Sequence, residues 1–491
     1  GFFAITWFAG GCQSMDLYYH THLIDMIMLG AVWLLMVLVT YLSFKHRKAW
    51  VSLLSIIPTI MVTYLELYGP EKAEIAHVHV DRLAVLMCII VGIIGSLIVI
   101  YSVGYMHGYH HHHTEVQDRR YYFFTLLFIF LGAMFGFVLS DGLLWLDLFW
   151  EMTSICSFLL IRYTMSEEAI NNAFRALWMN LLGGAALVVA ICYVGYTSGN
   201  LTLSNLVDRG VAGEATAVIP VALIAVAALT KAAQMPFNSW LLGAMVAPTP
   251  TSALLHSSTM VKAGVFMIIK LAPVLGMGNF AGIMVMMVGG ITFLFATFAA
   301  VSQSNAKRVL AYSTIANLGL IVTCGGIGTA EAVWAGVMLI IFHAITKSLL
   351  FLCVGTCEHN IGSRDIEDMD GLFVRMPKLA SFMIIGIAGM FLAPFGMLIS
   401  KWAAMTAFVD SGNVILVAII CFGSAVTAFY WIKWMGKLAG IVAGEERIDQ
   451  NVHKEETFVH MTLVILTVLV CLLFPLVSMY MLVPYLEIVF G

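Results

Sequence analysis

Charged side chains are scarce in this 491-residue sequence. Lys and Arg number 24 and Asp and Glu number 28, so 11% of the residues are charged, against about 25% in soluble proteins. Apolar residues make up 61%, and the mean hydropathy is +0.96. A soluble protein this apolar could not cover its surface with polar groups. The composition therefore predicts a polytopic membrane protein, and the net charge of −4 excludes a basic surface for nucleic acid.

Motifs for redox cofactors and nucleotides are also missing. The nine cysteines are scattered, and no CxxC, CxxCH or Cys–His pattern occurs, so we expect no cluster, haem, zinc or other cofactor in this chain. No phosphate-binding loop or dinucleotide fingerprint is present, which disfavours ATP-driven transport. The chain opens with GFFAITWFAGG and without Met. We expect residues 1–21 to form an external stub: a trimmed helix, a signal remnant or a surface segment.

Apolar stretches of about 20 residues, each able to cross about 30 Å of hydrocarbon, recur along the whole chain. They predict an all-α membrane protein with about fourteen transmembrane helices. The expected spans are 22–43, 50–68, 83–105, 121–139, 142–163, 170–196, 216–246, 251–273, 281–302, 308–327, 331–357, 379–409, 412–438 and 458–488.

Two of these spans are unusually long and contain a proline, Pro236 in the first and Pro394 in the second. Proline breaks or kinks a helix, which lipid tolerates only where protein or water satisfies the freed backbone groups. A broken helix in each half is typical of inverted repeats. We therefore expect two inverted five-helix repeats. The predicted units are helices 1–3 (22–105), the first repeat (121–273), the second repeat (281–438) and a C-terminal helix (458–491).

Lys and Arg are unevenly distributed between alternate loops. One side carries sixteen of them, Lys307 included, and the other carries four. Because basic residues are retained in the cytoplasm, the first side is predicted to be cytoplasmic. With an even number of spans, both termini are predicted to lie on the external side of the membrane, which would be the inner (cytoplasmic) membrane of the cell.

The remaining four basic residues, all lysines, fall inside apolar spans. A lysine at the centre of a bilayer costs about 2.5–3.5 kcal/mol, so a functional reason is expected for each. Lysines near helix ends can instead extend to the interface, an alternative that is strongest for the last of the four. Desolvation disfavours the ammonium form, which makes these residues candidates for reversible protonation. They are Lys231, Lys262, Lys347 and Lys401.

Glu151 is the expected partner of the first lysine. It lies ten residues beyond Asp141, which places it near the bilayer midplane at about 1.5 Å per residue. A buried carboxylate needs a partner, and Lys231 on the nearby broken span is the candidate. The pair would act as a protonic switch or, alternatively, as a static ion pair. Asp147, one turn earlier on the same face, would repel the Glu151 charge.

Three histidine-containing segments complete the set. His343 and Lys347 are four residues apart on one helical face, which favours a relay step over a structural role. His256 does not share a face with Lys262 and is either a separate station or a packing donor. Ser258 and Thr259 do lie on the Lys262 face, where we expect their hydroxyls to hydrate Lys262 or to form hydrogen bonds with it. The run MHGYHHHHTEVQDRR is predicted to be a solvated loop rather than a metal site.

The chain from YSVGYM at 101 to SKW at 402 resembles the antiporter-like subunits shared by respiratory complex I, multisubunit cation/proton (Mrp) antiporters and membrane-bound energy-converting hydrogenases. The matching motifs are FWEMTSICSFLL, TKAAQMPFNSWL, TPTSALLHSSTMVKAG, KRVLAYSTIANLG, FHAITKSLLFL and APFGMLISKW. The Met-Thr-Ser that follows Glu151 and the segment EHNIGSRDIEDMDGL at 358–372 look more like the hydrogenase and Mrp branches. Ala393-Pro394 stands where the family usually has two prolines, so we expect a milder second break.

The resemblance implies a line of proton stations parallel to the membrane. Glu151 and Lys231 would be the modulating pair, Lys262 and Lys347 the central stations with His343, and Lys401 the exit. His256 and Asp147 are further candidates.

On this basis we expect an H⁺- or Na⁺-translocating subunit of a redox-driven complex, a membrane-bound hydrogenase or a complex I-like oxidoreductase. Its partners would be further antiporter-like and anchor subunits in the membrane, and cytoplasmic dehydrogenase subunits or subunits with a NiFe centre and iron–sulfur clusters. The first alternative is a subunit of a redox-independent Mrp-type Na⁺/H⁺ antiporter. A second is a scaffold whose charges are vestigial.

Overall fold

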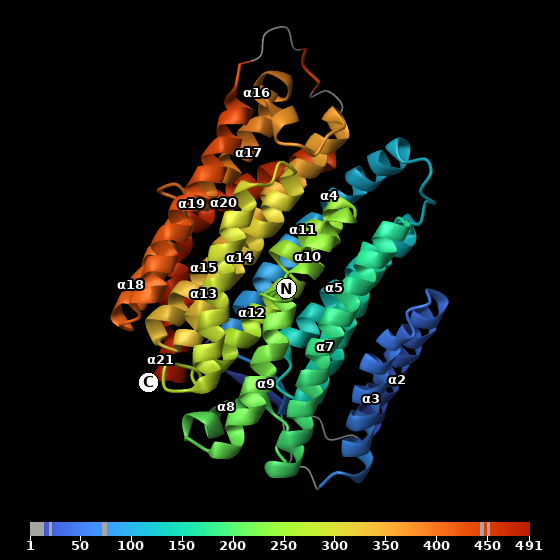
Figure 1. The fold of residues 1–491 in the computed structure, drawn as a ribbon, viewed down its shortest axis with the longest axis vertical. Helices are drawn as coiled ribbons and strands as arrows, with labels where there is room; N and C mark the ends of the chain where they lie inside the picture. The colour runs from blue at the N-terminus through green and yellow to red at the C-terminus, as the bar shows by residue number, and fades with distance from the viewer. Residues whose placement is uncertain (1–13, 19–21, 71–75, 442–445, 449–451) are drawn as a thin grey trace.

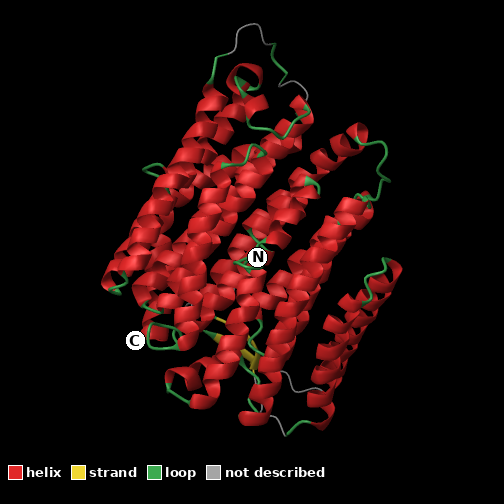
Figure 2. Cartoon of the chain, viewed as in Figure 1, coloured by secondary structure: helices red, strands yellow, loops and turns green. Residues whose placement is uncertain are grey.

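A computed structural model describes residues 14–18, 22–70, 76–441, 446–448 and 452–491. Most of the predicted N-terminal stub, with Cys12, lies outside the described residues. Of the stub, Met15–Tyr18 form strand β1, which pairs antiparallel with β2 (Ala76–Val80). Figure 2 shows these short strands at one end of an otherwise helical molecule.

The helices run roughly side by side, as Figure 1 shows. Before the first broken helix the chain forms α2 (His22–Lys45), α3 (Trp50–Tyr68), α4 (Arg82–His112), α5 (Arg120–Leu139), α6 (Leu143–Ile161), α7 (Glu167–Thr197) and the short α8 (Leu203–Val211). The broken helix and its successor comprise α9 (Ala215–Lys231), α10 (Ser239–Gly243), the 3-10 turn η1 (Ala244–Val246), α11 (Thr249–Ser257) and α12 (Met260–Leu271).

The second half follows with α13 (Phe280–Val301), α14 (Ala306–Ile327), α15 (Ala330–Ile361), the turn η2 (Glu367–Met369), α16 (Leu372–Arg375), α17 (Pro377–Phe391), α18 (Gly396–Asp410) and α19 (Val414–Ala439). The chain ends with α20 (Lys454–Val477), the π-helical turn η4 (Ser478–Leu482) and α21 (Val483–Phe490).

The all-α polytopic membrane fold predicted from the sequence is confirmed. Within the described residues, thirteen helical segments are long and apolar enough to cross a membrane, and α9 is a shorter apolar helix. With the break after α9, these segments match the fourteen predicted spans. Both predicted breaks are present, between α9 and α10 and between α17 and α18, and the second is the shorter. The boundaries of the two repeats and the orientation of the termini stay predictions.

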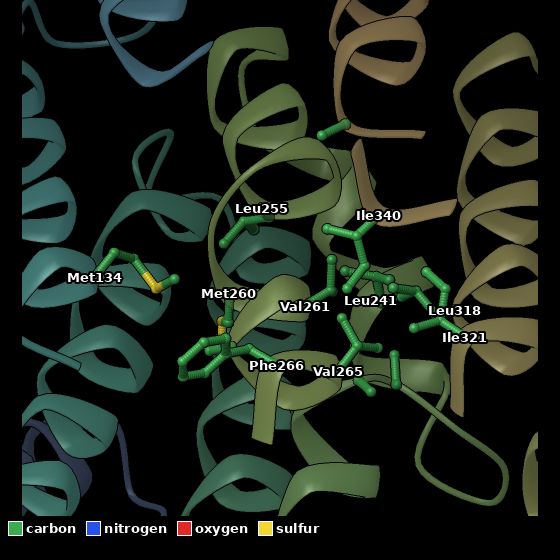
Figure 3. Close-up of a cluster of buried hydrophobic side chains, with 14 of the residues drawn as sticks. Met134, Leu241, Leu255, Met260, Val261, Val265, Phe266, Leu318, Ile321 and Ile340 are labelled. Carbon is green, nitrogen blue, oxygen red and sulfur yellow. The ribbon is translucent and has the colours of Figure 1, made fainter. Parts of the chain in front are cut away.

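Burial divides the helices into a centre and a periphery. The α11–α12 segment, α14 and α15 are almost entirely surrounded by protein, whereas α2, α3 and α20 expose most of their apolar residues. Figure 3 shows the apolar packing around α12, where Val265 lies on the side of Leu318 of α14 and Ile340 of α15, and Phe266 lies on the opposite side with Met260 and Met134. This packing fixes the helices that carry the central ionisable residues.

Candidate functional site

Lys231 is the last residue of α9, and it lies directly at the first helix break. Its ammonium group is completely buried and donates to the Trp150 carbonyl oxygen (2.8 Å) and to the hydroxyls of Thr153 (2.6 Å) and Ser154 (3.1 Å). It also lies 4.4 Å from the Trp150 ring, a cation–π distance. The break therefore anchors a lysine on one turn of α6.

Glu151 lies in that same turn of α6 but does not contact Lys231. No hydrogen bond or ion pair within 4.0 Å joins the two side chains in the described structure, so they are not in direct contact, and their role as a protonic switch stays a prediction. The carboxylate lies instead against Gly184 of α7, where an added Cβ would be 2.1 Å from Glu151 Oε1. Asp147 and Glu151 both line one cavity between α6 and the α2–α3 hairpin. The Asp147 Oδ1 atom is buried and makes no hydrogen bond to the described residues.

Lys262 of α12 and His343 of α15 form the central contact. Both are completely buried, and Lys262 Nζ is 2.7 Å from His343 Nδ1. The helix containing Lys262 is interrupted one turn earlier, between Ser257 and Met260, which the sequence did not predict. The expected hydroxyl contacts are not made: Thr259 bonds to the Leu254 carbonyl. His343 therefore takes the role that the sequence assigned to the hydroxyls.

The other two lysines lie on helices next to this contact. Lys347 is completely buried one turn beyond His343; its Nζ donates to the Leu310 carbonyl of α14 (3.1 Å) and lies 5.0 Å from the Trp431 ring. Lys401, 7% exposed, lies in α18 beyond the second break. Burial inside protein argues against the alternative that these lysines extend to the lipid headgroups.

His256 lies on α11 near the central contact. Both ring nitrogens are buried and make no hydrogen bond to the described residues, and its ring packs 4.8 Å from Phe351. The hydroxyls of Thr251, Ser252 and Ser258 are equally buried and unpartnered. Buried polar groups are satisfied by ordered water when protein offers no partner. We therefore expect the α11 face to be hydrated.

The predicted histidine loop is wrong in part. His107 and His110–His112 continue α4 as ordered helix, and His110 Nε2 is 2.8 Å from the Tyr163 hydroxyl. In the part of the chain that the structure describes, no group of three or more His, Cys, Asp or Glu side chains is placed to hold a metal ion.

Sequence reasoning missed a buried ionic cluster between α14 and α15. Lys307, which the sequence places among the sixteen surface cations, is completely buried. Its Nζ donates to the Ala247 carbonyl (3.2 Å) and lies 3.9 Å from Glu358, which also pairs with Arg364. Lys307 stands at the start of an apolar span, where a loop residue is expected, and its contacts with Ala247 and Glu358 come from parts of the chain distant in sequence.

A second missed group lies where α20 meets α4 and α15. Glu456 and His460 are 2% and 1% exposed, and Thr356 of α15 donates to the Glu456 carboxylate. The sequence spacing could have predicted this group, because Glu456 and His460 are four residues apart and therefore lie on one face of α20.

Comparison with known proteins places these residues in a family context. The family model described as NADH:quinone oxidoreductase/Mrp antiporter, transmembrane, matches residues 140–427, and one for the N-terminus of complex I chain 5 matches residues 76–116. Among curated proteins, the A1 subunit of a Na⁺/H⁺ antiporter of Staphylococcus saprophyticus is 32% identical over 430 residues, covering 81% of this chain and 52% of the relative. A Na⁺/H⁺ antiporter subunit of Alkalihalophilus pseudofirmus is 33% identical over 378 residues, covering 72% and 46%. The chain thus spans about half the length of the curated relatives it matches.

Two solved structures share the fold. The Mrp complex from a Dietzia species matches with a TM-score of 0.71 and 27% identity, over 91% of this chain and 50% of that one. An archaeal membrane-bound sulfane sulfur reductase matches with a TM-score of 0.74 and 21% identity, over 95% and 96%. At that identity, the second match shows the fold alone.

These relatives overturn one expectation. The sequence analysis assigned the chain to an oxidoreductase complex, but the curated proteins cited above, which match most of it, are named as Na⁺/H⁺ antiporter subunits. The assignment to an oxidoreductase is therefore wrong. The expectation of NiFe and iron–sulfur partner subunits depended on that assignment and finds no support in these relatives.

Proposed function

Because the chain belongs to the NADH:quinone oxidoreductase/Mrp antiporter transmembrane family, we propose that it is an ion-translocating membrane subunit of a multisubunit Na⁺/H⁺ antiporter. The observation that carries the proposal is the buried contact between Lys262 and His343. Two basic groups at 2.7 Å share one hydrogen bond, and neither has a carboxylate partner among the described residues. In a structural ion pair, each of these basic groups would contact a carboxylate, because a buried charge is normally compensated by a charge of opposite sign.

Protons would move along the buried groups in the order of their places in the bundle. Lys231, Lys262, His343 and Lys347 lie on α9, α12 and α15, and α12 packs against both of the other helices. Each lysine is buried inside protein, and the groups in contact with Lys231, Lys262 and Lys347 are carbonyl and hydroxyl oxygens, ring faces or a histidine, with no carboxylate within 4.0 Å among the described residues. Such weakly compensated sites bind and release protons more readily than paired ones.

Glu151 and Asp147 would bias this line from its α6 end. Lys231 contacts the Glu151 turn through Trp150, Thr153 and Ser154, so a change of charge at the carboxylates acts on the lysine across one helical turn. Lys401 would connect the line to the α18 end. The partners we propose are further membrane subunits, the membrane is the inner (cytoplasmic) membrane, and the coupled ions are H⁺ and Na⁺.

The test uses the full chain, expressed with its partner subunits in bacteria that lack other Na⁺/H⁺ antiporters. Everted membrane vesicles are acidified by ATP hydrolysis while respiration is inhibited, and a fluorescent ΔpH probe is followed as Na⁺ is added. We expect Na⁺ to dissipate the ΔpH without any redox substrate. Vesicles from cells without the chain are the control, and identical traces from both would contradict the proposal.

A further inference from the structure

The group formed by Glu456, Thr356 and Tyr101 lies apart from the lysine line. Glu456 is in the first turn of α20, Thr356 is near the end of α15, and Tyr101 is in α4. All three are at least nine-tenths buried. Thr356 donates to Glu456, while the Tyr101 hydroxyl is 3.1 Å from Thr356 Oγ1 and 3.0 Å from the Leu352 carbonyl.

Glu456 is a carboxylate without a cation. No Lys, Arg or His nitrogen of the described residues lies within 4.0 Å of it, although burying an uncompensated carboxylate is costly. The buried stripe of α20 consists otherwise of Val459, Leu463 and Thr467, with His460 between them. An apolar residue would pack this helix equally well, so a charge-bearing group here indicates function rather than packing.

The hydrogen bonds of this group can reverse their direction. With Glu456 ionised, Thr356 donates to it. With Glu456 protonated, the acid donates to Thr356, and Thr356 can donate to Tyr101, since each hydroxyl is both donor and acceptor. The group therefore satisfies both protonation states without moving a helix.

Two exits connect the group to its surroundings. On one side, Glu456 lies next to the exposed Glu455 and Lys454, at the end of the bundle predicted to face the cytoplasm. On the other side, a Cβ at Gly355 would be 2.8 Å from the Tyr101 hydroxyl and 2.6 Å from the Thr249 methyl Cγ2, so the absence of a side chain lets Tyr101 approach the start of α11. The Thr249 hydroxyl accepts from Tyr105 (3.2 Å), whose ring stacks on that of Tyr101 (5.5 Å).

From Thr249 a row of polar side chains follows α11. Thr251 and Ser252 have buried, unpartnered hydroxyls, and His256, one turn beyond Ser252, has two unpartnered ring nitrogens. Residues four apart lie on one face of a helix, so Ser252 and His256 are neighbours. The row ends beside the Lys262–His343 contact on α12 and α15.

We propose that Glu456 is a proton-transfer residue, which exchanges protons between the α20 end of the bundle and His256 through Thr356, Tyr101 and the α11 polar row. In the direction of Na⁺/H⁺ antiport, where protons move towards the predicted cytoplasmic end, the row gives a proton to Tyr101 and Tyr101 releases its own proton to Thr356. Thr356 then releases its proton to the Glu456 carboxylate, and the acid releases it to water, which leaves Glu456 ionised for the next proton. The inference rests on the proposed function, since it connects the same line to the end of the bundle.

The test compares Glu456→Gln with Glu455→Gln in the everted vesicles described above. Glutamine keeps the shape and still accepts from Thr356, but it can neither take up nor release a proton. We expect Glu456→Gln to slow Na⁺-dependent ΔpH dissipation at least tenfold, with the half-saturating Na⁺ concentration and the amount of assembled complex unchanged. Glu455→Gln, at the exposed neighbouring position, should be normal.

Each other outcome is decisive. A normal rate in Glu456→Gln would overturn the inference while leaving the proposed function intact, because a structural role is preserved by glutamine. If Glu456→Gln does not assemble, Thr356→Val and Tyr101→Phe decide: both should slow transport several-fold, and normal rates in both would overturn the inference. Absence of Na⁺-dependent dissipation in the unmodified complex would overturn the proposed function, and the inference with it.

Discussion

Replacing Lys262 with arginine tests whether this position needs only a permanent positive charge, as a structural role would require, or a side chain that gains and loses a proton. Lys262 is completely buried, and its Nζ is 2.7 Å from His343 Nδ1. Arginine keeps a positive donor, but its reference pKa exceeds that of lysine by at least about 2 units. At about 1.4 kcal/mol per unit, release of the proton becomes about 2.8 kcal/mol harder. We therefore expect Lys262→Arg to slow Na⁺-dependent proton movement about 100-fold.

The assay is the initial rate of ΔpH dissipation in everted vesicles, normalised to the amount of assembled complex. Lys270→Arg is the matched control, because Lys270 lies on the same helix, is ion-paired with Asp81 at the helix end, and retains that pair as arginine. A normal rate in Lys262→Arg would refute proton release at this position. An equal loss in Lys270→Arg would also refute the reasoning, because it would trace the effect to packing of α12.

Two further predictions concern packing and pH. Gly264→Ala places a Cβ 2.6 Å from the Ala232 nitrogen, a backbone atom that cannot move aside. We therefore expect the free energy of unfolding to fall by about 1–3 kcal/mol, with a lower melting temperature in detergent. Gly436→Ala, where the space around the Cβ is open, should melt like the unmodified protein, and equal melting of the two variants would contradict the contact. Burial raises the pKa of Asp81, but the charge and hydrogen bond of Lys270 outweigh it and hold that pKa below its usual value, so the pair stabilises the fold above about pH 4 and this contribution is lost as the pH falls through the folded-state pKa. Between about pH 7 and about pH 3.5, the melting temperature of Asp81→Asn should therefore fall less than that of the unmodified protein, and parallel curves would contradict the assignment.

The membrane spans could be read from the sequence with small errors at their ends. A continuous apolar run is a strong signal, and spans such as 50–68 coincide with the observed α3 (Trp50–Tyr68). The two proline breaks were equally legible, since proline cannot be accommodated within a regular helix. The break before Met260 was not, because no proline or glycine marks it. At this break the Thr259 hydroxyl donates a hydrogen bond to the Leu254 carbonyl, and the spacing of residues in the sequence does not predict such a bond.

The individual ionisable residues of the candidate site could be predicted, but not their partners. A charge in an apolar run stands out, and Lys231, Lys262 and Lys347 are all buried as expected. Which side chain meets which depends on how separate helices rotate and pack. That is why Lys262 was assigned to hydroxyls of its own helix although it meets His343, and why Glu151 was paired with a lysine it does not touch. Contacts between helices carry no signature within either helix alone.

Lys347 and Thr356 lie nine residues apart on the unbroken helix α15, which corresponds to about 13.5 Å at about 1.5 Å per residue. That distance is nearly half of a hydrocarbon layer of about 30 Å. Moving one charge through the full layer changes its free energy by about 2.3 kcal/mol per 100 mV. The free energy of a proton that moves between these two levels therefore changes by about 1 kcal/mol per 100 mV. Membrane voltage, and not the ion gradients alone, would therefore change its distribution between them about fivefold for every 100 mV.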